Sequence, residues 1–527
     1  MTKLLSPFAY SAKLDECGSK HLALYLAVKE AIIEGKLAPG ERLPSTRKLA
    51  ELYDLSRGSV SVAYEMLTAE GFVQAGIGQG TFVTGWEQEQ LGITADSEKA
   101  RSNGEQGYSR AAPALTKWGR RLSELRTLPD RNRLRHSDFP HGEDGQAGIS
   151  FVPEGVGTDW FPWTEWKAEV AQQWKKTGAS WRSDAQATEG SLSLRQAIAA
   201  RLRRERGIAC EAEDIVITAG AMQAIALLSQ LLLEEGRTAV IENPCYTGIQ
   251  RAVRATGARV IAQDVDANGI VPLDWDADLL FVTPTRQFPT GVVLSYERRR
   301  ALLTWASRRN AWIIEDDYDS DFRWGGRPIE PLKSLDKEGR VVYVGSFSRS
   351  MSVGVRIGYA VLPKELLGPF VKAKRLYDPQ PTGIAEQLAL SNWMSEGGYD
   401  RYMRRLRRTY GKLENKLRTG LDTRLGGLFE AAPADAGLHV YAKWKRDEEL
   451  YAELAEECAK RGAVWLDGMK YENRIGELSV KPAISAVFGF AHLTEERIEK
   501  GLSTICHAAQ CLGLIDSDEG QGGNVNA

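Results

Sequence analysis

The chain has 527 residues, of which 43% are hydrophobic, 26% charged and 9% aromatic, as in ordinary soluble globular proteins. At roughly 150 residues per domain, this length predicts more than one domain. The 68 lysines and arginines are balanced by 70 aspartates and glutamates, which excludes a uniformly basic nucleic-acid-binding protein. Any DNA site would therefore be local.

The cysteines and histidines give no sign of a metal centre. Six cysteines are spread along the chain without a CxxC pair, and six histidines show no ligand spacing. We expect reduced thiols and no dedicated metal site. No apolar stretch is long enough to span a bilayer, and the first ten residues lack the pattern of a signal peptide. These features predict a cytoplasmic protein with no membrane partner.

Composition divides the chain into four segments. Residues 10–85 and 147–514 are regularly patterned and predict folded domains, whereas 515–527 is a polar tail. The remaining segment, 86–146, is irregular and charged, and nine basic residues outnumber three acidic ones between Arg101 and Arg135. It is predicted to be a linker. Whether it only spaces the two domains or also contacts DNA phosphates stays open at this point.

Three helices are predicted near the start of the chain. His21–Gly35 carries apolar residues at helical spacing and ends at a glycine. Ser45 can cap a second helix that runs to about Tyr53, and Ser56 can cap a third. Two short helices joined by a tight turn are typical of a helix-turn-helix.

A predicted hairpin follows the third helix. Phe72–Gln74 and Thr81–Val83 flank a glycine-rich turn, so residues 10–85 are predicted to form a winged helix-turn-helix. A recognition helix needs small residues for close approach to the major groove and a long cation to contact bases, and Ser56 and Arg57 begin a segment of this kind. The alternative is a three-helix protein-interaction module with an incidental basic edge.

The motif GERLPSTRKLAELYDLSRGSVSVAYEMLTAEGFVQAGIGQGTFV, residues 40–83, closely resembles the DNA-binding domain of the GntR family of bacterial regulators. The resemblance implies that the partner is a double-stranded DNA operator. By that resemblance the expected DNA contacts are Arg42, Ser45, Arg47, Arg57, Ser59, Gln79 and Gly80. Their neighbours Thr46, Ser56, Gly58, Tyr64 and Thr81 complete the predicted DNA-binding set.

Strand and helix signals alternate through the second domain, which predicts a mostly parallel sheet flanked by helices, an α/β fold. Ligands of such sheets bind at the carboxyl ends of the strands. The predicted strands are Ile215–Ile217, Ala239–Ile241, Leu279–Val282, Trp312–Ile314 and Val341–Val344.

Short motifs follow these strands, and their order and spacing carry a second resemblance. They are Thr218–Gln223, Glu242–Tyr246, Thr283–Gly291, Glu315–Tyr318 and Gly345–Arg349. Together they resemble the fold-type I aminotransferase domain, which binds pyridoxal phosphate. Joined to a GntR-type domain, this pattern is identified as that of the MocR subfamily. The resemblance implies a homodimer of aminotransferase-like domains.

A cofactor site can be assigned residue by residue from this resemblance. A helix N-terminus at Gly220–Met222, two serine hydroxyls and Arg356 would hold a phosphate. Asp316 would pair with the pyridinium nitrogen, and Tyr246 would stack on the ring. We expect this site either to be vestigial or to bind its cofactor non-covalently. Its predicted residues are Gly220, Ala221, Met222, Tyr246, Gln287, Asp316, Tyr318, Ser346, Ser348, Arg349 and Arg356.

The chain departs from the family where the chemistry occurs. The family motif has a Schiff-base lysine after serine, and this chain has Ser348-Arg349. A guanidinium with a pKa above about 12 neither attacks an aldehyde nor shuttles protons readily. We therefore predict no catalytic residue. Arg286 is a further departure, because the family usually has histidine there.

Two interpretations of Arg349 stay open. It binds an anion, either non-covalent pyridoxal phosphate or another phosphate or carboxylate effector, or it fills a vestigial pocket by pairing with Asp316. The prediction is a sequence-specific transcriptional regulator whose aminotransferase-like domain dimerises and senses a small molecule without turnover. The alternatives are a pyridoxal-phosphate-dependent aminotransferase with an attached DNA-binding domain and a constitutive DNA-binding dimer.

Overall fold

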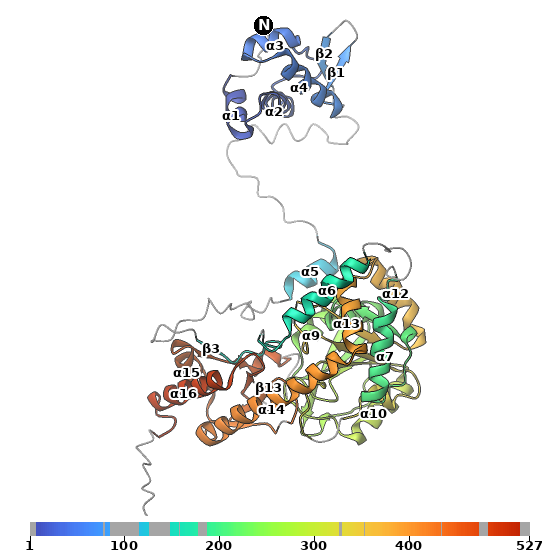
Figure 1. The fold of residues 1–527 in the computed structure, drawn as a ribbon, viewed down its shortest axis with the longest axis vertical. Coiled ribbons are helices and arrows are strands. Elements are labelled where there is room, and N and C mark those ends of the chain that lie inside the picture. Colours follow the sequence, from blue (N-terminus) through green and yellow to red (C-terminus); the bar gives the residue numbers. More distant parts are fainter. Residues whose placement is uncertain are drawn as a thin grey trace, which may run out of the picture. The chain divides into compact units, whose positions relative to one another are not determined.

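The computed structural model describes residues 7–76, 80–84, 115–125, 148–157, 159–177, 187–325, 329–352, 354–433, 435–473 and 483–516. The chain divides into two compact units, residues 1–113 and 114–527 (Figure 1). Each unit is described by itself.

The first unit is a small helical domain with a hairpin. Its elements are α1 (Pro7–Cys17), α2 (Lys20–Ile33), α3 (Thr46–Tyr53), α4 (Arg57–Ala69), β1 (Val73–Gly76) and β2 (Gly80–Val83). The three predicted helices and the hairpin are confirmed, and α1 is an addition. The core forms because apolar residues recur on one face of each helix, as with Leu24, Leu49 and Val60, which are all buried.

The predicted helix caps are present. The Ser45 hydroxyl accepts a hydrogen bond from the Lys48 amide at 3.3 Å, and the Ser56 hydroxyl accepts one from the Ser59 amide at 3.1 Å. Such caps satisfy amides that have no partner within the helix. They fix where α3 and α4 begin.

The second unit is built on an eight-stranded sheet with the order β4-β11-β10-β9-β8-β5-β6-β7. All pairings are parallel except those of β11 with its two neighbours and of β7 with β6. The five predicted strands are confirmed, whereas β6, β7 and β11 are additions. The bounds are β4 (Ile215–Thr218), β5 (Thr238–Asn243), β6 (Arg259–Asp266), β7 (Gly269–Ile270), β8 (Leu279–Val282), β9 (Trp312–Asp317), β10 (Val341–Ser346) and β11 (Gly358–Val361).

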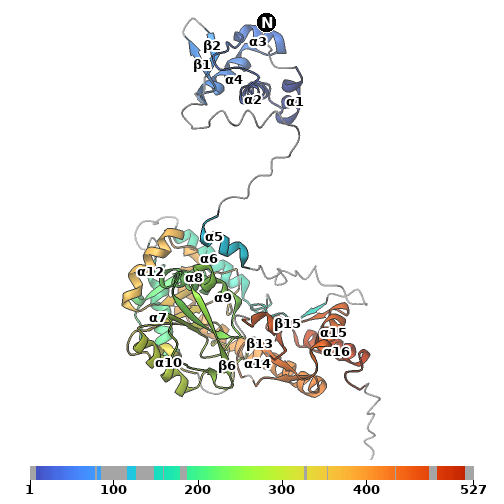
Figure 2. The same ribbon diagram turned by 180° about the vertical axis from the view of Figure 1, so that it is seen from behind.

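Helices cover both faces of this sheet, because its strands are apolar on both sides (Figure 2). In β5, Ala239 and Ile241 pack with α8, α9 and α12, whereas Val240 packs on the opposite face with α10. Successive residues of a strand point to opposite faces, which explains the division. The helices are α7 (Leu192–Arg206), α8 (Ala221–Leu232), α9 (Thr247–Thr256), α10 (Tyr296–Arg309), α11 (Leu332–Leu335) and α12 (Lys364–Tyr377).

A smaller four-stranded sheet, with the order β12-β13-β16-β15, lies in the C-terminal part of this unit. The long helix α14 buries its apolar side chains in the same core as this sheet and α16. The elements are α13 (Ile384–Ser395), α14 (Gly398–Leu425), β12 (Phe429–Ala431), β13 (His439–Trp444), α15 (Glu448–Lys460), β14 (Ala463–Val464), β15 (Leu466–Asp467), β16 (Ser485–Gly489) and α16 (Glu495–Cys511).

Three further elements precede the large sheet in sequence, namely α5 (Lys117–Glu124), β3 (Ile149–Ser150) and α6 (Trp163–Thr177). Helix α5 falls within 86–146, the segment predicted as a linker, and it packs against α9. Among the described helices of both units, none is long and apolar enough to cross a membrane.

Candidate functional site

The predicted DNA-binding residues of the first unit gather around the starts of α3 and α4 and the hairpin. Arg47, Ser56 and Arg57 are exposed, and Arg57 is the first residue of α4. Arg42 is also exposed and lies against the start of β2, since a Cβ at Gly80 would stand 2.7 Å from its Nε. The start of α4 and the start of β2 therefore each have an exposed arginine.

Two members of the DNA-binding set have other placements. Tyr64 is buried, and its hydroxyl donates a hydrogen bond to the Pro44 carbonyl at 2.7 Å, which ties α4 to the segment before α3. Gln79 lies outside the described residues. Tyr64 thus has a structural role in holding the two helices together.

In the second unit, a cavity of about 150 Å³ opens at the carboxyl ends of the parallel strands. We call it the effector cavity. It is lined by Gly220, Ala221, Met222, Ile225, Tyr246, Phe288, Asp316, Tyr318, Ser346, Ser348, Arg349 and Arg356. Ten of the eleven residues predicted for a cofactor site line it, and no lysine is among its lining residues.

One end of the effector cavity is the start of α8. Gly220 has φ of 93°, a conformation that favours glycine, and it leaves room for Arg356, whose Nη2 donates to the Ala219 carbonyl at 2.6 Å. Unpaired backbone amides at a helix N-terminus attract anions, and a guanidinium adds a full positive charge. This end of the cavity suits a phosphate.

Polar groups without partners also line the cavity. Asp316 Oδ1, the Tyr318 hydroxyl and the Ser348 hydroxyl are buried and form no hydrogen bond with the described residues. Burial raises the pKa of the Asp316 carboxyl and Asp317 raises it further, so the pKa stands at about 7 although Arg349 lowers it. A bound ligand could satisfy all three groups.

Arg349 forms no ion pair with a carboxylate of the described residues. Asp316 and Asp319 both lie near enough for its positive charge to lower their pKa values. The pairing of Arg349 with Asp316 that would fill a vestigial pocket is therefore not formed. The Arg349 guanidinium stays available to a ligand.

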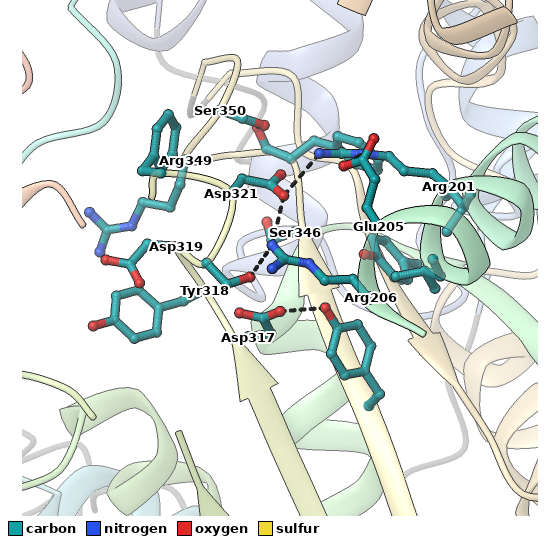
Figure 3. Close-up of a pocket in the computed structure, with 17 residues that line it drawn as sticks. Arg201, Glu205, Arg206, Asp317, Tyr318, Asp319, Asp321, Ser346, Arg349 and Ser350 are labelled. Atoms are coloured by element: carbon teal, nitrogen blue, oxygen red, sulfur yellow. Dashed lines mark hydrogen bonds and ion pairs between the residues drawn. The ribbon is translucent and has the colours of Figure 1, made fainter. Parts of the chain in front are cut away.

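Behind the cavity lies a network of buried charges (Figure 3). Arg201 and Arg206 each donate to Asp321 Oδ1 at 2.9 Å, and Tyr343 donates to Asp317 Oδ2 at 2.5 Å. Burial would raise the pKa of Asp321, but the arginines outweigh burial and lower it to about 2. The network fixes the loop that follows β9 and so positions Tyr318.

Comparisons with known proteins match both units. Residues 20–83 match the family described as bacterial regulatory proteins, gntR family, and residues 162–465 match aminotransferase class I and II. Among relatives, the HTH-type transcriptional regulator TauR of Rhodobacter capsulatus is 34% identical over 401 residues, 75% of this chain and 78% of TauR. The chain belongs to the MocR-type GntR regulators.

Other relatives of this regulator agree. The probable rhizopine catabolism regulatory protein MocR of Rhizobium meliloti is 29% identical over 93% of this chain and 94% of its own. The HTH-type pyridoxine biosynthesis transcriptional regulator PdxR of Corynebacterium glutamicum is 29% identical over 91% of this chain and 94% of its own. The predicted DNA-binding transcriptional regulator is confirmed, and its enzyme alternative is not supported.

Solved aminotransferases share the fold of the second unit. LysN, an α-aminoadipate aminotransferase of Thermus thermophilus, superposes with a TM-score of 0.64 at 23% identity over 75% of this chain and 98% of its own. The kynurenine aminotransferase of Pyrococcus horikoshii gives 0.62 at 21% identity over 80% of this chain and 99% of its own. The predicted fold of this MocR-type regulator, a winged helix-turn-helix and a fold-type I aminotransferase-like domain, is confirmed.

Gln287 is the one predicted cofactor residue outside the effector cavity. Its amide nitrogen donates to the Pro244 and Phe288 carbonyls, and its oxygen accepts from Thr290, so it joins its own loop to the loop that follows β5. Ile225 and Phe288 line the cavity without having been predicted. Phe288 belongs to a motif already noted, but apolar wall residues carry no chemical signal in sequence.

Proposed function

We propose that the aminotransferase-like unit of this regulator senses a phosphate-bearing anion and has no turnover, with pyridoxal phosphate held non-covalently as the first candidate. The observation that carries the proposal is a cavity lined by Arg349 and Arg356 and by no lysine. A guanidinium binds anions through its N–H donors and its positive charge, but it does not act as a nucleophile as the amine of a lysine does.

The lining residues suit each group of pyridoxal phosphate, but they include no lysine to form a covalent bond with its aldehyde. The start of α8 and Arg356 would hold the phosphate, and Asp316 would face the ring nitrogen. Tyr246, which is the N-cap of α9, would contact the ring. Arg349 would hold a negatively charged ring substituent where the family places its lysine.

We further propose that the protein acts in the cytoplasm as a homodimer, since dimeric regulators recognise paired half-sites. The domain boundaries in this proposal are 10–85 for DNA binding, 86–146 for the linker, 147–514 for sensing and dimerisation, and 515–527 for the tail. Helix α5, which lies within the linker, then docks on the sensing domain.

The test is an absorbance spectrum of the purified full chain mixed with pyridoxal phosphate, before and after dialysis and borohydride reduction. We expect a ligand that dialysis removes and that borohydride does not attach. Arg356→Gln should lose binding, and Arg349→Lys should gain a reducible covalent link. A reducible link in the wild-type protein would overturn the proposal.

A second measurement connects the cavity to DNA. Operator affinity, measured by mobility shift with and without pyridoxal phosphate, should change for the wild-type protein and stay constant for Arg356→Gln. An operator affinity that no phosphate-bearing metabolite changes would favour the constitutive DNA-binding dimer instead.

A further inference from the structure

A second cavity lies where α5 meets α9 and the short helix η7 (Gly468–Tyr471). It has a volume of about 490 Å³ and shares no lining residue with the effector cavity. We call it the basic cavity. It is lined by Arg121, Glu124, Leu125, Thr247, Gln250, Arg251, Arg254 and Lys470.

Two cations fasten helix α5 beside this cavity, namely Arg121 and Lys117, whose Nζ donates to Glu235 Oε2 at 2.9 Å. Arg121 donates from Nε to the Ala255 carbonyl at 3.0 Å and from Nη2 to the Thr256 carbonyl at 3.2 Å, and its Nη1 lies 2.7 Å from Glu235 Oε1. Ala255 and Thr256 end α9, where carbonyls have no partner within the helix and the helix dipole attracts cations. Arg121 therefore both attaches α5 to α9 and lines the cavity.

Helix η7 is fixed to the opposite end of α9. The Tyr471 carbonyl accepts hydrogen bonds from the Cys245 amide at 3.0 Å and from Gln250 Nε2 at 3.1 Å. The neighbouring residue, Lys470, is held at the cavity wall as a result. The cations of three separate elements are thus brought to one place by specific contacts.

Arg254 is incompletely paired within the described residues. One of its terminal nitrogens donates to the Asn473 side-chain oxygen, its Nε is buried without a hydrogen-bond partner, and no carboxylate of the described residues pairs with it. A buried donor without a partner costs free energy, and a charged one costs more. An anion in the cavity would compensate the charge of this guanidinium.

We infer that the basic cavity is a second anion site, which takes a small molecule with a phosphate group and tightens the docking of α5 on α9. Four cations and one carboxylate line it, and one of the cations, Arg121, is already paired with Glu235. Guanidiniums bind phosphate through two parallel hydrogen bonds, and Arg254, which pairs with no carboxylate of the described residues, lines this cavity. The bound phosphate would join the linker helix to the sensing domain at a point distinct from the effector cavity.

Hydrogen–deuterium exchange of the full chain, with inorganic phosphate as the probe, tests this inference. Sodium chloride at equal ionic strength is the comparison, because screening alone changes exposed ion pairs. At a phosphate concentration about ten times its Kd, the fraction of protein without bound phosphate falls about tenfold. Amides that exchange only in the phosphate-free state should therefore exchange about ten times more slowly. We expect this slowing in α5 and α9, and we expect it also in Arg356→Gln, which lacks the effector-cavity guanidinium.

The variants localise the effect. Arg254→Gln and Lys470→Gln should each abolish or weaken the slowing, and Arg254→Lys should keep part of it. Arg259→Gln is the matched control, because Arg259 is exposed, follows α9 closely in sequence and does not line the cavity. The far-ultraviolet circular dichroism of each variant reports whether it has folded.

Three results with inorganic phosphate as the probe would overturn the inference. They are unchanged exchange in wild-type α5 and α9, equal slowing in Arg254→Gln, and loss of slowing in Arg259→Gln as well. Slowing by a DNA duplex of scrambled sequence but not by inorganic phosphate would also overturn it, and would assign the basic cavity to the DNA backbone. Slowing confined to α8 would place phosphate in the effector cavity alone.

Discussion

Arg286 and Asp319 form an ion pair in the interior of the sensing domain, with 3.2 Å between Nε and Oδ2 and with side chains only 4% and 2% exposed. Arg286 Nη2 also donates to the His439 carbonyl at 3.0 Å, so the arginine joins the loop after β8 to β13 of the smaller sheet. Burial raises the pKa of Asp319 to about 7, although Arg286 and Arg349 both lower it. The ion pair is therefore sensitive to pH.

Replacement of Arg286 by methionine should destabilise the domain by about 3 kcal/mol at high pH, because a buried carboxylate loses its partner. Without Arg286 the folded-state pKa of Asp319 rises further above the unfolded value of about 3.9, so the folded chain binds the extra proton. Stability then falls as pH rises through the folded-state pKa. Urea unfolding should show a larger loss at about pH 8 than at about pH 6.

The control for this prediction is Arg286→Met combined with Asp319→Leu. The double variant has no carboxyl at position 319 and should lose the added pH dependence. An equal loss of stability at both pH values in Arg286→Met would show that packing, and not the charge of Asp319, sets the cost.

Arg57→Ala should remove discrimination for the operator while leaving non-specific DNA affinity nearly unchanged. Arg57 is exposed at the start of α4, and a side chain that contacts a base edge contributes about 1–3 kcal/mol of discrimination. Competition between operator and scrambled duplex in mobility-shift titrations measures this. Lys36→Ala, an exposed lysine paired with Glu34, is the control. If discrimination persists in Arg57→Ala, another residue recognises the operator.

Gly220→Ala should weaken ligand binding in the effector cavity by tenfold or more. The backbone at Gly220 is one that other residues adopt at a cost of about 1–3 kcal/mol, and the new Cβ would stand 3.0 Å from Arg356 Nη2. The guanidinium proposed to hold the phosphate would be displaced. Isothermal titration with pyridoxal phosphate measures the effect, with Gly368→Ala as control, because a Cβ at Gly368 meets no atom within 4 Å. Equal affinities would remove Gly220 from the phosphate site.

The linker arginines should differ in their contribution to DNA binding. If the linker contacts phosphates, the joint replacement of Arg110 and Arg120 should weaken binding to all duplexes and lower the salt slope by up to about two. Arg120 is exposed, whereas Arg121 is occupied by α9 and Glu235. Arg121→Gln should therefore leave the salt slope unchanged. A slope that neither variant changes would make the linker a spacer only.

Sequence patterns predicted the features that short segments determine. The caps at Ser45 and Ser56 follow from neighbouring residues, and the buried parallel strands are short apolar runs between turn signals. Strand β11 was not predicted, since its four residues begin with glycine and its place between β4 and β10 depends on partners distant in sequence. The smaller sheet was not predicted for the same reason.

Sequence motifs predicted most residues of the site. The roles that depend on contacts between residues distant in sequence were not predicted. Gln287 lies in a motif, but its hydrogen bonds to Pro244 and Thr290 hold it between the loops after β5 and β8, outside the lining of the effector cavity. In the sequence Arg121 is one of several linker cations. In the structure it pairs with Glu235, which lies more than a hundred residues later in the chain. The ion pair of Arg286 with Asp319 was not predicted either, because a sequence pattern does not show which two charged residues meet in the core of a domain.

Helix α9 has Tyr246 at its N-terminal end in the effector cavity and offers its C-terminal carbonyls to Arg121 of α5. Ten residues at 1.5 Å each make it about 15 Å long, a distance over which a helix moves as one body. A genetic screen for regulators that no longer respond to their ligand should therefore yield substitutions in α9. Substitutions along α9 would give regulators that bind ligand and operator normally yet fail to respond, and strains that carry them would express the regulated genes at one fixed level.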